Sequence, residues 1–171
     1  MQRKHNLKLL VALITTFSAM VMVPQALAMS DKIIKQRIED KANDTFRLKR
    51  TKVEVAVEDG YVVLYGTVDL YIKKMLYEQI TWKTKGVFEV ENEIRVVPKL
   101  PQADADIKRN IMEVVHSHRR LQGVNLEVAV EGGAVRINAT FEHPSDVLFF
   151  KHRVAEVEGV ITINIFAQFV V

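Results

Sequence analysis

The sequence Glu54-Val55-Ala56-Val57-Glu58 occurs a second time, without change, at Glu127–Glu131. From Asp31 onward the chain matches itself without a gap when Glu54 is aligned with Glu127. The identical pairs include Ile34/Ile107, Lys35/Lys108, Ile38/Ile111, Leu48/Leu121, Gly60/Gly133, Val62/Val135, Thr67/Thr140 and Gly86-Val87/Gly159-Val160. One register held over so many positions indicates an internal repeat. We therefore predict two similar domains, residues 29–97 and 104–171, joined by a linker at 98–103 that two prolines stiffen.

Each repeat starts with the pattern of an amphipathic helix. Apolar residues recur every fourth position after Asp31 and again after Asp104. The residues concerned are Ile34, Ile38 and Ala42, then Ile107, Ile111 and Val115. We expect a helix at the start of each repeat, with Asp31 and Asp104 as N-caps.

The hydrophobic period then changes to two. Val53–Val57 alternates apolar and polar residues, Asp59-Gly60 is typical of a tight turn, and alternation resumes from Val62. The second repeat does the same on either side of Gly132-Gly133. Both repeats therefore predict a β-hairpin with one buried face.

A second helix and a last strand complete each repeat. We expect the helices to begin near Asp69 and near Pro144 and to end at Gly86 and Gly159, acting as left-handed C-caps. Alternation resumes after each glycine, and a strand, a helix and a further strand should pair in parallel with a right-handed crossover. The predicted fold class is α/β (α+β): two tandem α-β-β-α-β domains, each a three-stranded mixed sheet with two helices on one face.

The composition is that of an ordinary globular protein. The chain has 171 residues, 49% of them hydrophobic and 26% charged, and no cysteine. This excludes a disordered chain, a disulfide scaffold, a thiol nucleophile and a cysteine-ligated zinc site. The net charge of +3 is due to Arg3, Lys4 and Lys8, because the chain beyond residue 28 has equal numbers of basic and acidic residues. We therefore expect no nucleic-acid partner.

Residues 1–28 are typical of a secretory signal peptide. Early cations precede an apolar run from Leu9 to Val23, and Pro24 and Ala26-Leu27-Ala28 follow. The run is shorter than the ~20 residues that a transmembrane helix needs. We expect cleavage after Ala28 and export to the periplasm, with an uncleaved membrane anchor as the alternative.

Two motifs of the first repeat resemble the BON domain family. They are the hairpin Asp-Gly-x-Val-x-Leu-x-Gly-x-Val from Asp59 to Val68 and the ending from Gly86 to Val96. The second repeat departs from this pattern, with Gly132 in place of the aspartate and Ala139 in place of the hairpin glycine. The resemblance implies a non-enzymatic role in the bacterial envelope, involving phospholipid contact and protection under osmotic stress.

The sequence contains no motif that predicts catalysis or a cofactor. The serines beyond residue 28 are Ser30, Ser117 and Ser145, and none lies in a Gly-x-Ser-x-Gly motif. Accordingly we expect no enzymatic activity and no cofactor.

The histidines beyond residue 28 all lie in the second repeat, at His116, His118, His143 and His152. They are candidate zinc or copper ligands. His116 and His118, however, are two positions apart on a predicted helix and so point about 200° apart. Solvated histidines are therefore the favoured interpretation, and no metal site is predicted.

Cations gather between the first helix and the first strand of each repeat. They are Arg47, Lys49, Arg50 and Lys52, then Arg119 and Arg120 beside His118; Lys108 and Arg109 lie on the preceding helix beside Met112. Each cation near an anionic membrane contributes ~1 kcal/mol, and an apolar side chain that inserts adds to this. We expect these residues to contact anionic phospholipid; solubilising charge is the alternative.

The uncovered sheet face of the first repeat is a second candidate surface. It carries Tyr61, Val63 and Tyr65, whereas the second repeat has Arg136 and Asn138 there. Such a face is typical of a protein contact. The alternative function is therefore a protein-binding or holdase-like envelope factor. Unpaired edge strands also offer a route to self-association.

Overall fold

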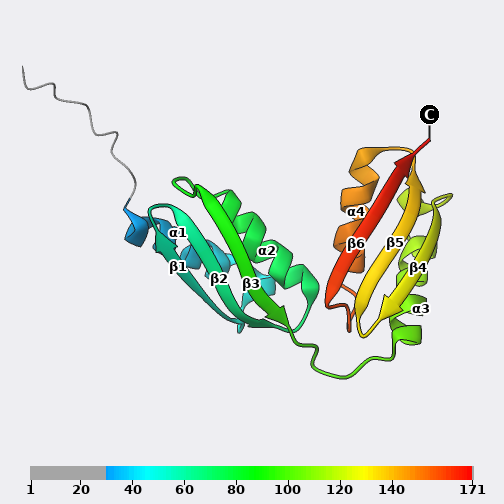
Figure 1. The fold of residues 1–171 in the computed structure, drawn as a ribbon, viewed down its shortest axis with the longest axis horizontal. Helices are drawn as coiled ribbons and strands as arrows, with labels where there is room; N and C mark the ends of the chain where they lie inside the picture. The colour runs from blue at the N-terminus through cyan, green and yellow to red at the C-terminus, as the bar shows by residue number, and fades with distance from the viewer. Residues whose placement is uncertain (1–29, 171) are drawn as a thin grey trace, which may run out of the picture.

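The computed structural model describes residues 30–170 and contains two α-β-β-α-β units, as the repeat predicts (Figure 1). The first unit comprises α1 (Asp31–Asp44), the short 3-10 helix η1 (Phe46–Leu48), β1 (Lys52–Glu58), β2 (Tyr61–Val68), α2 (Tyr71–Trp82) and β3 (Glu89–Val96). The second comprises α3 (Asp104–Ser117), η2 (Arg119–Leu121), β4 (Asn125–Glu131), β5 (Ala134–Phe141), α4 (Pro144–Val154) and β6 (Thr162–Phe169). The predicted signal peptide lies outside the described residues.

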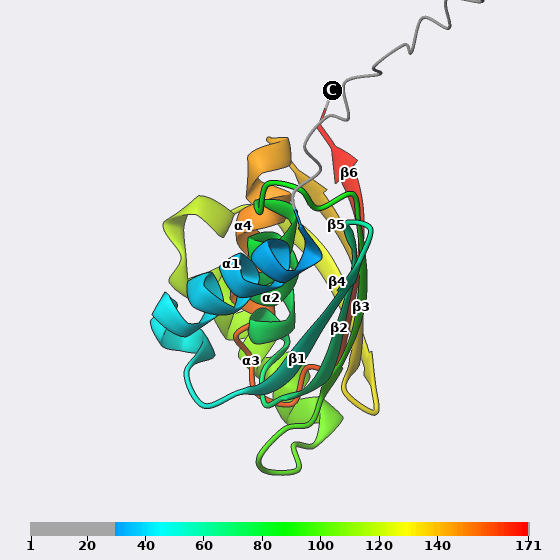
Figure 2. The ribbon, with the colours of Figure 1, turned by 90° about the vertical axis from the view of Figure 1, so that its left-hand side faces the viewer.

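Both sheets have the same topology. The strand orders are β1-β2-β3 and β4-β5-β6, with the first pair antiparallel and the second pair parallel in each. The helices of each unit lie on one side of its sheet (Figure 2). The predicted fold class, two mixed three-stranded sheets with two helices on one face, is confirmed.

The core of each unit lies between its helices and its sheet. In the first unit Ile34 and Ile38 of α1 are fully buried, in one cluster with Val62 and Leu64 of β2. The matched residues Ile107, Ile111, Val135 and Ile137 are buried in the second cluster. The period-four and period-two patterns therefore meet at the same interface in both units.

The prediction that Asp31 and Asp104 cap their helices is wrong. Ser30 and Ala103 occupy the N-cap positions. The Asp31 carboxylate instead accepts hydrogen bonds from the hairpin-turn amides of Asp59 (2.9 Å) and Gly60 (3.0 Å). Asp104 accepts from Gly132 and Gly133 at 2.8 and 2.9 Å. Each aspartate joins the first helical turn to the β-hairpin, because a carboxylate satisfies two turn donors that the hairpin leaves unpaired.

The expected bounds of the second helix were also partly wrong. The first-unit helix begins at Tyr71, two residues after Asp69, and α2 and α4 end several residues before Gly86 and Gly159. These two glycines do adopt positive φ, 98° and 90°, but in the loops beyond the helices. There the carbonyl of each lies against the hairpin glycine, so that a Cβ on Gly60 would lie 2.7 Å from the Gly86 oxygen. Glycine therefore recurs at these positions because the backbone of the hairpin turn and that of the loop after the second helix pass close to each other in both units.

The two units meet at a contact that we call the joint. The Ile72 amide at the start of α2 donates to the Ala155 carbonyl just beyond α4, over 2.8 Å. The Ile72 side chain is 2% exposed and belongs to the second unit's core cluster. Arg47 of η1 pairs with Glu156, which also pairs with Arg153 at 3.0 Å. The start of one helix and the end of the other thus satisfy each other's free backbone groups.

Candidate functional site

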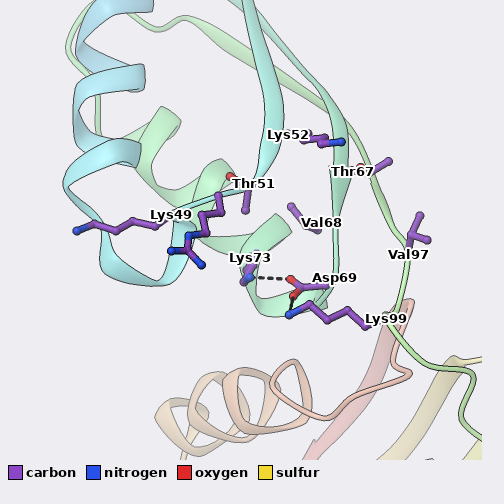
Figure 3. Close-up of a pocket in the computed structure, with 10 residues that line it drawn as sticks. Lys49, Thr51, Lys52, Thr67, Val68, Asp69, Lys73, Val97 and Lys99 are labelled. Atoms are coloured by element: carbon purple, nitrogen blue, oxygen red, sulfur yellow. Dashed lines mark ion pairs between the residues drawn. The ribbon is translucent and has the colours of Figure 1, made fainter.

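An open pocket of about 520 Å³ lies at one end of the first sheet (Figure 3). Its walls come from the segment after η1 and the start of β1, the end of β2, α2 and the segment beyond β3. The lining residues are Lys49, Arg50, Thr51, Lys52, Thr67, Val68, Asp69, Lys73, Val97 and Lys99. Among these, five side chains are cationic and one is a carboxylate. We call this cavity the basic pocket.

Asp69 holds two of the cations in place. Its carboxylate lies 2.6 Å from the Lys73 amine, one helical turn further on, and 3.1 Å from the Lys99 amine. Figure 3 shows both lysines directed at this carboxylate. Burial alone would raise the pKa of Asp69, but the hydrogen bonds from Lys73 and Lys99 outweigh it and the pKa is lowered. Asp69 is therefore ionised at neutral pH and organises two ammonium groups at the pocket wall.

The other three cations, Lys49, Arg50 and Lys52, form no ion pair with any residue between 30 and 170. The Lys49 amine lies 5.7 Å from the centroid of the Phe46 ring. That ring belongs to η1 and is 82% exposed. The exposed Phe46 ring therefore has one cation beside it, and two more cations without a carboxylate partner among residues 30–170 follow in the sequence.

Arg50 has an unusual backbone. Its φ is 65°, in the left-handed region that side chains with a Cβ rarely adopt. The matched residue in the second unit is Gly123, with a φ of 89°. The turn therefore requires a left-handed residue in both units, and the first unit places an arginine where glycine adopts this conformation without strain.

The second unit has a pocket at the matched place, but without this charge. Its volume is about 290 Å³, and its walls are Arg120, Gln122, Gly123, Val124, Asn125, Thr140, Glu142, Asp146 and Val170. Gln122, Gly123, Asn125 and Asp146 stand where the first unit has Lys49, Arg50, Lys52 and Lys73. We call this cavity the matched pocket; two carboxylates and one cation line it.

Two of the cations predicted to contact lipid, Arg120 and Arg47, form ion pairs with other residues of the protein. Arg120 lies 2.5 Å from Asp146, donates to Ser145 and stacks over Phe149 with 5.0 Å between guanidinium carbon and ring centroid. Arg47 forms the ion pair of the joint.

The remaining predicted lipid contacts are spread over the second unit. Arg109 pairs with Asp106 at 2.6 Å, while Lys108 and Arg119 are exposed. Met112 is half-buried and packs against the second unit's core. The buried stripe of α3, Ile107, Ile111 and Val115, did not reveal that the adjacent face of this helix also contacts apolar side chains. Of the predicted lipid residues, Lys49, Arg50 and Lys52 share the basic pocket.

Sequence reasoning missed Asp69, Lys73 and Lys99. The spacing of four between Asp69 and Lys73 is typical of a helical ion pair and offered a partial indication. Lys99 lies in the linker, far from Asp69 in the sequence, and only the tertiary fold brings the two together.

The open face of the first sheet is acidic as well as aromatic. The Tyr61 phenol donates to Glu91 (2.8 Å) and the Tyr65 phenol to Glu54 (3.0 Å). These hydrogen bonds raise the pKa of both phenols. Tyr61 and Tyr65 are 36% and 40% exposed, and Val63 lies half-buried between them. The predicted face is thus present, and its tyrosines are held by carboxylates.

The histidines of the second unit bond locally. His116 and His118 each place Nδ1 against the carbonyl four residues earlier, at 2.7 and 2.8 Å, and the His118 ring meets the Phe149 ring edge-on. Within residues 30–170, no three His, Cys, Asp or Glu side chains are grouped so that they could hold a metal ion.

Comparison with known proteins identifies the first unit. A family model described as the BON domain matches residues 30–98. A protein of Anaplasma centrale, described as "Uncharacterized protein in gshII 5'region", is 32% identical over 90 residues, which are 50% of this chain and 60% of that protein. The chain therefore spans less than two thirds of that relative's length.

Two solved structures of CdsD, a structural protein of the type III secretion system of Chlamydia trachomatis, are also similar. Their TM-scores are 0.31 and 0.32 at 11% and 14% identity, over 82% of this chain and 67% and 61% of theirs. Likenesses at this level do not bear on function. The family match covers the first α-β-β-α-β unit, and residues 30–98 of this chain are therefore similar to the BON domain family.

Proposed function

We propose that this protein is a non-enzymatic envelope protein that binds anionic phospholipid surfaces through its first unit. The observation that carries the proposal is Phe46, 82% exposed, with the Lys49 amine against its ring and Arg50 and Lys52 nearby in sequence. An aromatic side chain flanked by cations is suited to the boundary between headgroups and acyl chains.

The cations and the aromatic ring each contribute a modest free energy to such binding, and these contributions add. Each cation contributes ~1 kcal/mol near an anionic surface, and salt weakens this contribution. Burial of an exposed phenylalanine contributes about 1.5–3 kcal/mol and is insensitive to salt. We therefore expect reversible binding that falls with salt without disappearing.

The proposed setting is the periplasm, where the protein supports the envelope under osmotic stress. Support comes from the signal-peptide pattern of residues 1–28 and from the BON family resemblance. No helix within residues 30–170 is both long and apolar enough to cross a bilayer. Contact with the membrane surface, rather than insertion by a described helix, is the mode that we propose.

Flotation with vesicles tests the proposal. The chain from Met29, the expected product of cleavage, should float with phosphatidylglycerol-rich vesicles and much less with phosphatidylcholine vesicles. Phe46→Ser should lower the partition coefficient about tenfold at both low and high salt, because the apolar contribution is lost. Phe88→Ser is the matched control, since Phe88 is 81% exposed in the loop before β3 and is not among the residues lining the basic pocket. Equal flotation with neutral vesicles, or equal losses for the two variants, would contradict the proposal.

A second candidate function is protein binding through the open sheet face. Its support is the exposed pair Tyr61 and Tyr65, with Val63 between them, on the sheet face that no helix of residues 30–170 covers. Changing both tyrosines to serine should leave flotation unchanged. The same variant should lose the ability to delay aggregation of an unfolded test protein if this second function is correct, and should act like the unchanged protein if it is not.

A further inference from the structure

We propose that the basic pocket is a discrete site for one phosphate monoester group. This inference deepens the proposed function and rests on it for the membrane source of the ligand. The proposal differs from diffuse surface attraction because it predicts a saturable site of defined stoichiometry within the first unit.

The lining of the basic pocket carries an excess of positive charge. Among the residues lining the pocket, five are cationic and one is a carboxylate, and they come from segments far apart in the sequence. Three of them lack a carboxylate partner among residues 30–170. A volume of about 520 Å³ is in the range of small-molecule sites. Such a concentration of unpaired cations repels itself until an anion enters.

Asp69 organises part of the site. It forms ion pairs with Lys73 and Lys99 and so fixes two flexible side chains at the pocket wall. Each ammonium has three donors, so each lysine keeps donors for a phosphate oxygen while it remains bound to Asp69. Asp69 therefore lowers the entropy cost of assembling the site, and the lining retains an excess of positive charge.

The turn at Arg50 is strained. A left-handed φ costs a residue with a Cβ about 1 kcal/mol, and the second unit avoids this cost with Gly123. Strain of this kind persists at sites where the side chain is needed. The second unit has glycine at this position, so the fold does not require arginine there. Arg50 is therefore explained by a ligand of its guanidinium group.

The matched pocket lacks these cations. The same backbone carries Gln122, Gly123, Asn125 and Asp146 at the places of four first-unit cations. Folding of an α-β-β-α-β unit therefore does not require cations at these positions. Their presence in one unit alone points to a ligand of that unit.

A phosphate monoester fits this chemistry best. It carries close to two negative charges near neutral pH and three exposed acceptor oxygens. Lysines supply point charges and Arg50 a planar fork, a combination suited to phosphate. Phosphatidic acid in a membrane and glycerol 3-phosphate in solution present this same group.

Calorimetric titration of the chain from Met29 with glycerol 3-phosphate tests the soluble source. We expect a single saturable site, and the double variant Arg50→Gly with Lys52→Asn should bind at least tenfold more weakly, about tenfold being the loss of one charge-assisted contact. These substitutions install the residues of the second unit. The charge-matched control is Lys32→Gln with Lys85→Gln, two exposed lysines outside the pocket, which should bind as the unchanged chain does.

Flotation with phosphatidic acid against phosphatidylglycerol vesicles of equal surface charge tests the membrane source. The site is supported if the chain prefers phosphatidic acid vesicles and the double variant loses this preference. The site is also supported if the chain shows no such preference but binds glycerol 3-phosphate saturably, and the ligand is then a soluble one. Absence of both overturns the phosphate site, while flotation with phosphatidylglycerol still upholds the proposed function. Saturable phosphate binding without flotation on any anionic vesicle overturns the proposed function and leaves the pocket assignment in place.

Discussion

The basic pocket and the matched pocket occupy the same place in two copies of one fold, yet they carry opposite charge. Lys49, Arg50, Lys52 and Lys73 in the first unit correspond to Gln122, Gly123, Asn125 and Asp146 in the second. What the units share is architectural: the buried helix stripe, the hairpin glycines, and an aspartate that holds the hairpin turn. The difference between the units therefore separates residues that build the fold from residues that serve a task.

The starts of the second helices differ in the same way. Ile72 of α2 is buried against the second unit, whereas the matched Ser145 of α4 is exposed and accepts a hydrogen bond from Arg120. The first unit thus uses this position to hold its neighbour. In the second unit the residue at this position, Ser145, binds Arg120, which also pairs with Asp146.

The largest effect should follow from Ile72→Ser, which installs the residue of the second unit. Loss of a fully buried isoleucine costs about 2–5 kcal/mol, and the hydroxyl left in the joint adds to the penalty. We expect a lower urea midpoint and a larger radius of gyration by small-angle scattering, because the units separate. Ile33→Ser on the exposed side of α1 is the control, and Ile33 is 45% exposed. A variant that keeps both the midpoint and the radius would show that the joint does not hold the units together.

Much of this comparison was predictable from the sequence, because hydrophobic period reports which face of an element is buried. The open face of Tyr61 and Tyr65 follows from this period, the register of the internal repeat from the identical residues, the hairpins from the turn residues as well, and the parallel last strands from the right-handed crossover. Period carries no information on which polar group a side chain reaches. The roles of Asp31, Asp69 and Lys99 depend on contacts between segments distant in the sequence, and those of Ile72 and Arg47 on contacts between units.

A smaller effect, equal in the two units, is expected at the shared aspartates. Asp31→Ala and Asp104→Ala each leave two turn amides without their acceptor, at a cost of about 1–3 kcal/mol. Hydrogen exchange should quicken at Asp59 and Gly60 in the first variant and at Gly132 and Gly133 in the second. Asp40→Ala on the exposed side of α1 should leave both turns protected. A loss of protection in one unit alone would mean that the two turns are not held alike.

The smallest effect, and the only one expected to stabilise, belongs to Arg50→Gly. Relief of the left-handed strain should raise the unfolding free energy by at most ~1 kcal/mol, offset in part by the greater freedom of glycine in the unfolded chain. Gly123→Ala is the reciprocal test. A Cβ at Gly123 would meet no atom within 4 Å, so any destabilisation there measures the backbone alone. Arg50→Gly could stabilise the fold while it weakens phosphate binding. That result would show that Arg50 lowers stability and is retained for binding. Destabilisation by Arg50→Gly would instead assign Arg50 to the architecture that both units share.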